Sequence, residues 1–168
     1  MILLGTMEER PNVVFRTREQ TSLIGTFAVY DSQSQASQHI PDQWRAFRLL
    51  HPALDTASKL YGASPCTADG KIHYLTGVAQ ETSAGLIADE QLTLEAGEYA
   101  VVHLEDAALL RDTWSWLLRE WLPISGRRER HAPEFERFSA ISEAGTPVGP
   151  VEIWIPLEPL EAKELHRG

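Results

Sequence analysis

The sequence predicts an α+β fold made of two similar halves, each with the order strand, helix, strand, strand. Segments rich in Val, Ile, Phe and Thr, which favour strands, occur in residues 12–95 and again in residues 96–158. Each half also contains one segment whose apolar side chains repeat at helical spacing. Because the strands follow each helix in pairs, the order indicates a duplicated α+β unit and not the alternation of a parallel α/β sheet.

The first half contains one strong helix pattern. A helix is expected to begin near Pro41, since proline suits a first turn, after a polar connection over residues 31–39. Its apolar face includes Trp44, and Pro52 ends it. A second short helix is expected over residues 53–61, closed by Gly62. The strands of this half are expected at residues 12–16, 22–30, 72–81 and 91–94.

The second half repeats this order with a longer amphipathic helix. Asp106 is the expected N-cap, and Pro123 is expected to stop the helix. The apolar stripe predicts that Trp114 and Trp121 are buried. Its members are Leu110, Trp114, Leu117, Leu118 and Trp121. The strands are expected at residues 98–104, 135–141 and 151–157, with a Gly/Pro-rich connection over residues 143–150.

The composition excludes several classes of function. The 168 residues carry 15 Lys and Arg against 24 Asp and Glu, a net charge of −9 that disfavours nucleic acid and anionic lipid as partners. No apolar run reaches the roughly 20 residues of a membrane helix, and the single cysteine, Cys66, excludes an internal disulfide. The histidines form no metal-binding pair, and there is no nucleotide or cofactor motif. We therefore expect a cytoplasmic protein without metal or cofactor.

Two strand segments combine a carboxylate with an aromatic ring. Side chains alternate between the faces of a strand, so Glu152 and Trp154 share one face of the last strand. Glu136 and Phe138 likewise share a face of the strand before it. Rings and a carboxylate together suit a cationic ligand, because ring faces attract positive charge. Alternation alone leaves two interpretations open, a binding cleft or a solvent face with surface ion pairs.

Five segments occur in an order and spacing that resemble a known family. They are IHYLTGV (residues 72–78), LEAGEYAVVHLED (94–106), TWSWLLREWLPISG (113–126), APEFERF (132–138) and VEIWIPL (151–157). Together they are similar to the GyrI-like small-molecule-binding domain, the effector-binding domain of AraC-type and MerR-type regulators. The resemblance covers residues 12–158, with an N-terminal arm over 1–11 and a tail over 159–168.

The resemblance implies two strand–helix–strand–strand units, about 12–95 and 96–158, related by a pseudo-twofold axis with a ligand cleft between them. Family members bind hydrophobic, cationic or planar compounds against aromatic walls with an acid in the cleft. Carried over, these roles fall on Glu136, Glu152 and Trp154. Phe138, which shares a face with Glu136, is a further expected ligand-binding residue, and Trp44 or Tyr74 is expected to close the box. Residues 1–11 are too few for the helix-turn-helix domain of the family's regulators, so we expect a stand-alone domain that does not bind DNA.

Three functions agree with the resemblance. The first is binding of a xenobiotic or metabolite for sequestration or sensing. The second is hydrolysis of cyclopropane-bearing, DNA-alkylating natural products, with Glu136 as the candidate general base. The third is inhibition of a DNA-processing enzyme through an acidic surface. The sequence leaves the ligand, the oligomeric state and the choice between Glu136 and Glu152 as the key acid open.

Overall fold

The structure, a computed structural model, describes residues 10–51, 59–80 and 90–160. Its strands form one eight-stranded sheet with the order β1-β6-β8-β7-β3-β4-β2-β5, and every neighbouring pair is antiparallel. The strands are β1 (Val14–Arg18), β2 (Thr21–Tyr30), β3 (Leu60–Ser64), β4 (Ile72–Ala79), β5 (Glu90–Leu94), β6 (Gly97–Leu104), β7 (Glu134–Ile141) and β8 (Pro147–Pro156). With the helices described next, this confirms the predicted α+β class.

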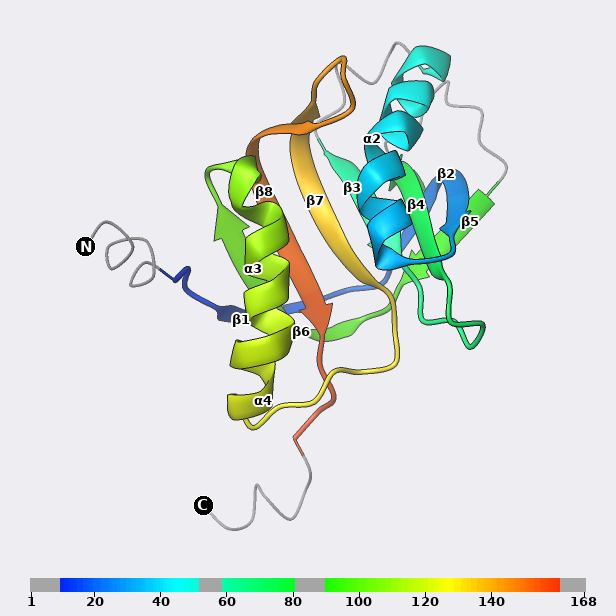
Figure 1. Ribbon diagram of the computed structural model, residues 1–168. Helices are drawn as coiled ribbons and strands as arrows, with labels where there is room; N and C mark the ends of the chain where they lie inside the picture. The colour runs from blue at the N-terminus through cyan, green and yellow to red at the C-terminus, as the bar shows by residue number, and fades with distance from the viewer. Residues whose placement is uncertain (1–9, 52–58, 81–89, 161–168) are drawn as a thin grey trace, which may run out of the picture.

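Two helical regions cover one face of the sheet, and β7 runs between them (Figure 1). The first is α2 (Gln33–Leu50). The second is continuous from Ala107 to Ile124, and we call it the second helical region. It consists of η3 (Ala107–Leu109), α3 (Leu110–Trp116), the π-helical η4 (Leu117–Trp121) and α4 (Leu122–Ile124). Residues on the helix-facing side of the central strands therefore lie between segments from both halves of the chain.

Helix α2 begins eight residues earlier than the sequence predicted. Ser32 is its N-cap, because the Ser32 hydroxyl accepts a hydrogen bond from the Gln35 N–H at 3.1 Å. Pro41 lies inside the helix, and the supposed polar connection over residues 31–39 is mostly helical. Buried Trp44 and Phe47 pack against the sheet, and this packing outweighs the weaker helix preference of the serines in the first turns.

The second helical region begins as predicted and ends slightly later. Asp106 is the N-cap of η3, and its carboxylate accepts a hydrogen bond from the Ala108 N–H at 2.9 Å. Pro123 does not stop the helix at once, because the helical region continues by one residue to Ile124, with Pro123 in the short segment α4 after the π-helical turn. The π-helical turn shifts the apolar stripe around the helix axis, so Leu118 is 39% exposed while Leu117 is buried.

Several strand boundaries also differ from the prediction. β3 occupies the end of the segment predicted as helix 53–61, and residues 52–58 lie outside the described part of the chain. The alternation that identifies a strand is hidden there, because Leu60, Tyr61 and Ala63 are buried from both faces. β8 begins at Pro147, inside the predicted connection 143–150. Strands β2, β5, β6 and β7 match their predicted ranges within one residue.

The sheet separates two buried clusters. Trp44, Tyr74 and Phe138 belong to the cluster beneath the helices, which also contains Ile153. Trp154, the next residue along β8, belongs to the second cluster, with Leu23, Tyr61, Tyr99 and Phe135 as further members. Consecutive residues of a strand point to opposite faces, so the two clusters lie on opposite sides of the sheet.

The edge strands join the two halves of the chain. β1 directly precedes β2 in sequence but pairs with β6, and β5 directly precedes β6 but pairs with β2. β3 and β7 pair at the centre of the sheet. The first half therefore supplies β1 to the second half's end of the sheet, whereas β5 stays beside β2 of its own half, and a single sheet carries both halves.

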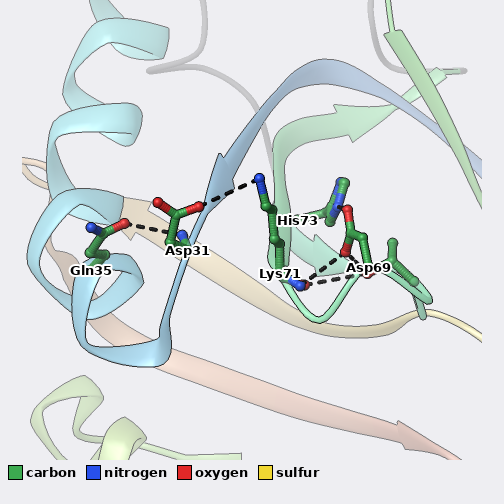
Figure 2. Close-up of polar contacts among 6 residues, drawn as sticks. Asp31, Gln35, Asp69, Lys71 and His73 are labelled. Carbon is green, nitrogen blue, oxygen red and sulfur yellow. Dashed lines mark hydrogen bonds and ion pairs between the residues drawn. The ribbon is translucent and has the colours of Figure 1, made fainter.

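A cluster of polar side chains links the start of α2 to the turn between β3 and β4 (Figure 2). The Gln35 amide oxygen accepts a hydrogen bond from the Asp31 N–H at 3.0 Å, and Lys71 Nζ lies 3.6 Å from Asp31 Oδ1. Asp69 contacts His73 Nε2 at 2.8 Å and accepts from the Lys71 N–H at 2.9 Å. The hydrogen bond from the Lys71 N–H is the main reason that the pKa of Asp69 falls to about 2. These surface contacts lie at the start of β4, the strand that carries Tyr74.

Candidate functional site

Glu136 lies on the helix-facing side of β7, at the centre of the sheet. It pairs with Gly62 on β3 and with Ile153 on β8. Each carboxylate oxygen accepts one hydrogen bond from a different element. The Tyr74 hydroxyl on β4 donates to Oε1 at 2.9 Å, and the Trp114 indole N–H on α3 donates to Oε2 at 2.7 Å. The carboxylate is therefore held in one orientation by both halves of the chain.

The charge of Glu136 is not neutralised by a basic side chain in the described part of the chain. Both hydrogen-bond donors are neutral groups, and no described Lys, Arg or His forms an ion pair with it. Burial raises the pKa of Glu136 because it disfavours the charged form, while the hydrogen bonds from Trp114 and Tyr74 oppose the rise. The residue as a whole keeps partial exposure to solvent.

Aromatic side chains surround this carboxylate on the helix-facing side. Trp44, Tyr74 and Phe138 are all at least 95% buried, and the Trp44 and Phe138 rings meet edge to face at 5.6 Å. Trp44 Nε1 lies close to the Tyr74 hydroxyl but has no hydrogen-bond partner of good geometry. Burial, followed by the charge of Glu136, raises the pKa of Tyr74 well above its ordinary value. Tyr74 therefore stays a neutral hydrogen-bond donor.

Trp114 is not the core residue that its helical stripe predicted. It is partly exposed, because it reaches toward Glu136 from α3. Trp121 is also partly buried and lies 6.1 Å from the Phe15 ring of the edge strand β1. Of the aromatic residues around Glu136, Trp114 is the one most open to solvent, since Trp44, Tyr74 and Phe138 are buried beneath it.

The prediction that Glu152 and Trp154 line the same cleft as Glu136 is wrong. Trp154 pairs directly with Phe135 on β7, and Glu152 pairs with Arg137. Directly paired residues share a face, and Phe135 and Arg137 alternate with Glu136. Glu152 and Trp154 therefore lie on the opposite side of the sheet from Glu136. The sequence correctly showed which residues share a face within each strand. It did not show how β7 and β8 pair, and that pairing decides whether Glu136 and Trp154 lie on the same face of the sheet.

The second acid–aromatic pair binds the protein's own arginines. Trp154 stacks on Phe135 at 5.4 Å with an interplanar angle of 12°, and the Arg18 guanidinium lies 5.0 Å from both ring centroids. Arg137 lies over Trp154 and forms an ion pair with Glu152 at 2.7 Å. Burial raises the pKa of Glu152, but the Trp154 hydrogen bond and Arg137 outweigh it and lower the pKa overall. A ligand cation would have to displace these groups.

Sequence reasoning missed a second carboxyl group on the helix-facing side of β7. Glu134 precedes Glu136 by two residues and therefore shares its face. Its Oε2 is buried without a hydrogen-bond partner. Burial, with the nearby charges of Glu129 and Glu136, raises the pKa of Glu134 to about 8. The signal was present in the spacing of the two acids in APEFERF, but the sequence did not show that Glu134 is buried.

We expect Glu134→Gln to stabilise the protein at alkaline pH. The folded-state pKa of about 8 exceeds the ordinary 4.5, so folding favours the protonated form. That preference is fully present below pH 4.5 and is lost as pH rises through 8. An amide mimics the protonated acid, so the variant should gain roughly 4 kcal/mol at pH 8.5 and almost nothing at pH 4. Urea unfolding at both pH values measures this, with exposed Glu143→Gln as the control. Equal effects at both pH values would contradict the expectation.

Two surface hollows lie away from Glu136. One of about 320 Å³ separates α2 from the outer half of β2, with Phe27, Tyr30 and Gln43 in its lining. The other, of about 510 Å³, lies beside the loop that follows α4 and is lined mainly by residues 122–129. Among the described residues, no group of three or more His, Cys, Asp and Glu side chains could hold a metal ion. No helix in the described ranges has the length and apolar character of a membrane span.

On this sheet the Glu136 carboxylate is held by Tyr74 of β4 and Trp114 of α3. The model of the GyrI-like small molecule binding domain matches residues 11–158, so the chain belongs to this family. This confirms the predicted resemblance.

Solved structures of other proteins have a similar fold. SAV2435 bound to tetraphenylphosphonium is 21% identical, with a TM-score of 0.72 over 92% of this chain and 99% of that chain. An integron cassette protein from the mobile metagenome of Vibrio cholerae is 17% identical, with a TM-score of 0.65 over 87% and 95% of the two chains. EcmrR, in a complex with DNA, is 12% identical, with a TM-score of 0.57 over 95% of this chain and 63% of EcmrR. At these identities the likeness concerns the fold. A search of curated proteins gave no match.

Proposed function

We propose that the protein binds hydrophobic cations between α2 and the second helical region, with Glu136 as the charge that recognises them. The observation that carries this proposal is the carboxylate itself. It is oriented by two neutral donors and, within the described residues, has no cationic partner. Its raised pKa records the cost of holding this charge in a partly buried place. A cation without its own hydrogen-bonding shell would remove that cost and lie against aromatic rings.

Trp114 is the proposed point of entry to the site. It contacts Glu136 directly and is partly exposed, whereas Trp44, Tyr74 and Phe138 are buried. A ligand approaching Glu136 from solvent therefore passes along the Trp114 ring, and Trp114 gives way as the ligand enters. The tetraphenylphosphonium bound by SAV2435 is a ligand of the proposed chemistry, and it is the natural first probe. Sequestration or sensing of such compounds is the role that we infer.

Tetraphenylphosphonium should quench or shift the tryptophan fluorescence of the protein, and its affinity should rise with pH. Glu136 must be ionised to attract a cation, and its pKa is raised, so the midpoint of the rise should lie above the ordinary glutamate value. Fluorescence titration between pH 4 and 9 measures this. Tetraphenylborate, which has the same shape and the opposite charge, is the matched control and should bind far more weakly at neutral pH. Equal binding of both ions would contradict a role for the carboxylate.

A hydrolase acting on a strained, alkylating ring is a second candidate. The raised pKa of Glu136 favours it, because a general base works best when its pKa approaches the working pH. In this role Glu136 would take a proton from a water that opens the ring. Incubation with a cyclopropane-bearing alkylator, followed by product analysis, separates the candidates. A ring-opened product that Glu136→Gln fails to form supports the hydrolase, and recovery of intact compound supports binding alone.

We also infer that residues 12–95 and 96–158 are two related units with the ligand cleft between them. The order β2, α2, β3, β4 in the first unit parallels β6, second helical region, β7, β8 in the second. The donors to Glu136 support a site shared by both units, because Tyr74 belongs to the first and Trp114 to the second.

A further inference from the structure

Gly62 lies between the two residues that define the proposed site. It is in the middle of β3, directly paired with Glu136 on β7 and with Thr76 on β4. Tyr74 is on β4, two strands away from Glu136, and adjacent strands are about 4.8 Å apart. The Tyr74 side chain must therefore cross over β3 to place its hydroxyl 2.9 Å from Glu136.

The Tyr74 side chain crosses β3 where Gly62 has no side chain. A Cβ atom on Gly62 would lie 1.8 Å from the Tyr74 hydroxyl oxygen, 2.5 Å from Cζ and 3.1 Å from Cε1. The first two distances are shorter than real Cβ atoms show, the third is tight, and the tyrosine is 5% exposed among packed neighbours. Any larger residue at position 62 would push the hydroxyl away from Glu136.

The backbone gives no other reason for a glycine at this position. The positive-φ glycines of the described chain are Gly70, Gly97, Gly126, Gly145 and Gly149, and Gly62 is not among them. A glycine in a strand interior is unfavourable relative to alanine when the backbone does not require it. The close approach of Tyr74 is the feature that accounts for the glycine.

We propose that Gly62 is a positioning residue for the ligand-binding carboxylate. Because Gly62 has no side chain, it leaves the space through which Tyr74 reaches and orients Glu136. This rests on the proposed function of Glu136. The Tyr74 hydrogen bond favours the ionised form of Glu136, so filling that space should leave the acid harder to ionise. Gly62 thereby acts on cation affinity without touching the ligand.

The test compares Gly62→Ala with Tyr74→Phe in the full chain without ligand. Carbon-13 NMR of the Glu136 carboxyl carbon reports its titration directly. Both variants should raise the Glu136 pKa above that of the wild type, and Gly62→Ala should add little in a Tyr74→Phe background. Gly126→Ala is the control for general destabilisation, because Gly126 has a φ of 77° and open space around it. It should leave the Glu136 titration unchanged.

A wild-type Glu136 titration in Gly62→Ala, or fully additive shifts in the double variant, would overturn the proposal. If Gly62→Ala does not fold, Gly62→Ala/Tyr74→Leu should restore folding, since leucine ends short of the new methyl group, and failure to restore it also overturns the proposal. Tetraphenylphosphonium affinity at acidic pH should fall roughly two- to tenfold in Gly62→Ala, the factor of one ordinary hydrogen bond. Absence of binding to the wild type would refute the proposed function, while the ligand-free titration would still decide the role of Gly62.

Discussion

Replacing Glu136 by Gln is expected to weaken binding of tetraphenylphosphonium by about two orders of magnitude. Two unit charges about 5–6 Å apart, at the effective dielectric constant of about 20 that suits protein sites, attract by ~3 kcal/mol. Each 1.4 kcal/mol corresponds to a factor of about ten in affinity. Neutral triphenylphosphine oxide should lose little affinity, because the amide retains the volume of the acid. Calorimetric titration of both compounds measures the difference.

Glu152→Gln is the matched control for this prediction. Glu152 is on β8, the strand next to Glu136 on β7, but it lies on the opposite face of the sheet and forms an ion pair with Arg137. Its substitution should leave tetraphenylphosphonium affinity unchanged. Equal losses in Glu136→Gln and Glu152→Gln, or no loss in Glu136→Gln, would show that Glu136 does not supply the recognition charge.

Trp154→Ala should destabilise the protein by about 3–5 kcal/mol, the usual cost of removing a buried tryptophan. Trp154 is 7% exposed, stacks on Phe135 and lies beneath Arg18 and Arg137. The folded fraction should bind tetraphenylphosphonium with unchanged affinity, because Trp154 lies on the far side of the sheet from Glu136. Urea unfolding and ligand titration at low temperature measure the two effects separately.

Trp116→Ala is a useful comparison for this second prediction. Trp116 is partly exposed on α3, under the guanidinium of Arg10, and its removal should cost much less stability. A stable Trp154→Ala protein that has lost ligand binding would mean that the two faces of the sheet have been assigned the wrong way round.

Much of the fold was predictable because its signals are local. The alternation in β7 correctly placed Glu136 and Phe138 on one face, and the cap at Asp106 correctly located the start of the second helical region. The start of α2 was not predictable from Pro41. The signal that was missed is also local, because Ser32 followed three residues later by Gln35 is an N-cap pattern, and buried Trp44 and Phe47 hold the helix against the sheet.

The site was predictable only in part, because its geometry depends on strand register. Trp44, Tyr74, Glu136 and Phe138 do meet on the helix-facing side of the sheet. Trp154 showed the same acid–aromatic pattern as Glu136, yet the pairing of Phe135 with Trp154 places it on the other face. The space at Gly62 depends on three strands at once, so a glycine expected only to close the supposed helix 53–61 gave no sign of it.

A crystal structure of the protein with tetraphenylphosphonium tests the central claim most directly. The account predicts that the cation lies between α2 and the second helical region, with Glu136 as the nearest carboxylate and Trp114 displaced from its present position. A cation bound on the opposite face beside Trp154, or in the hollow between α2 and β2, with the Trp114–Glu136 hydrogen bond intact, would contradict it.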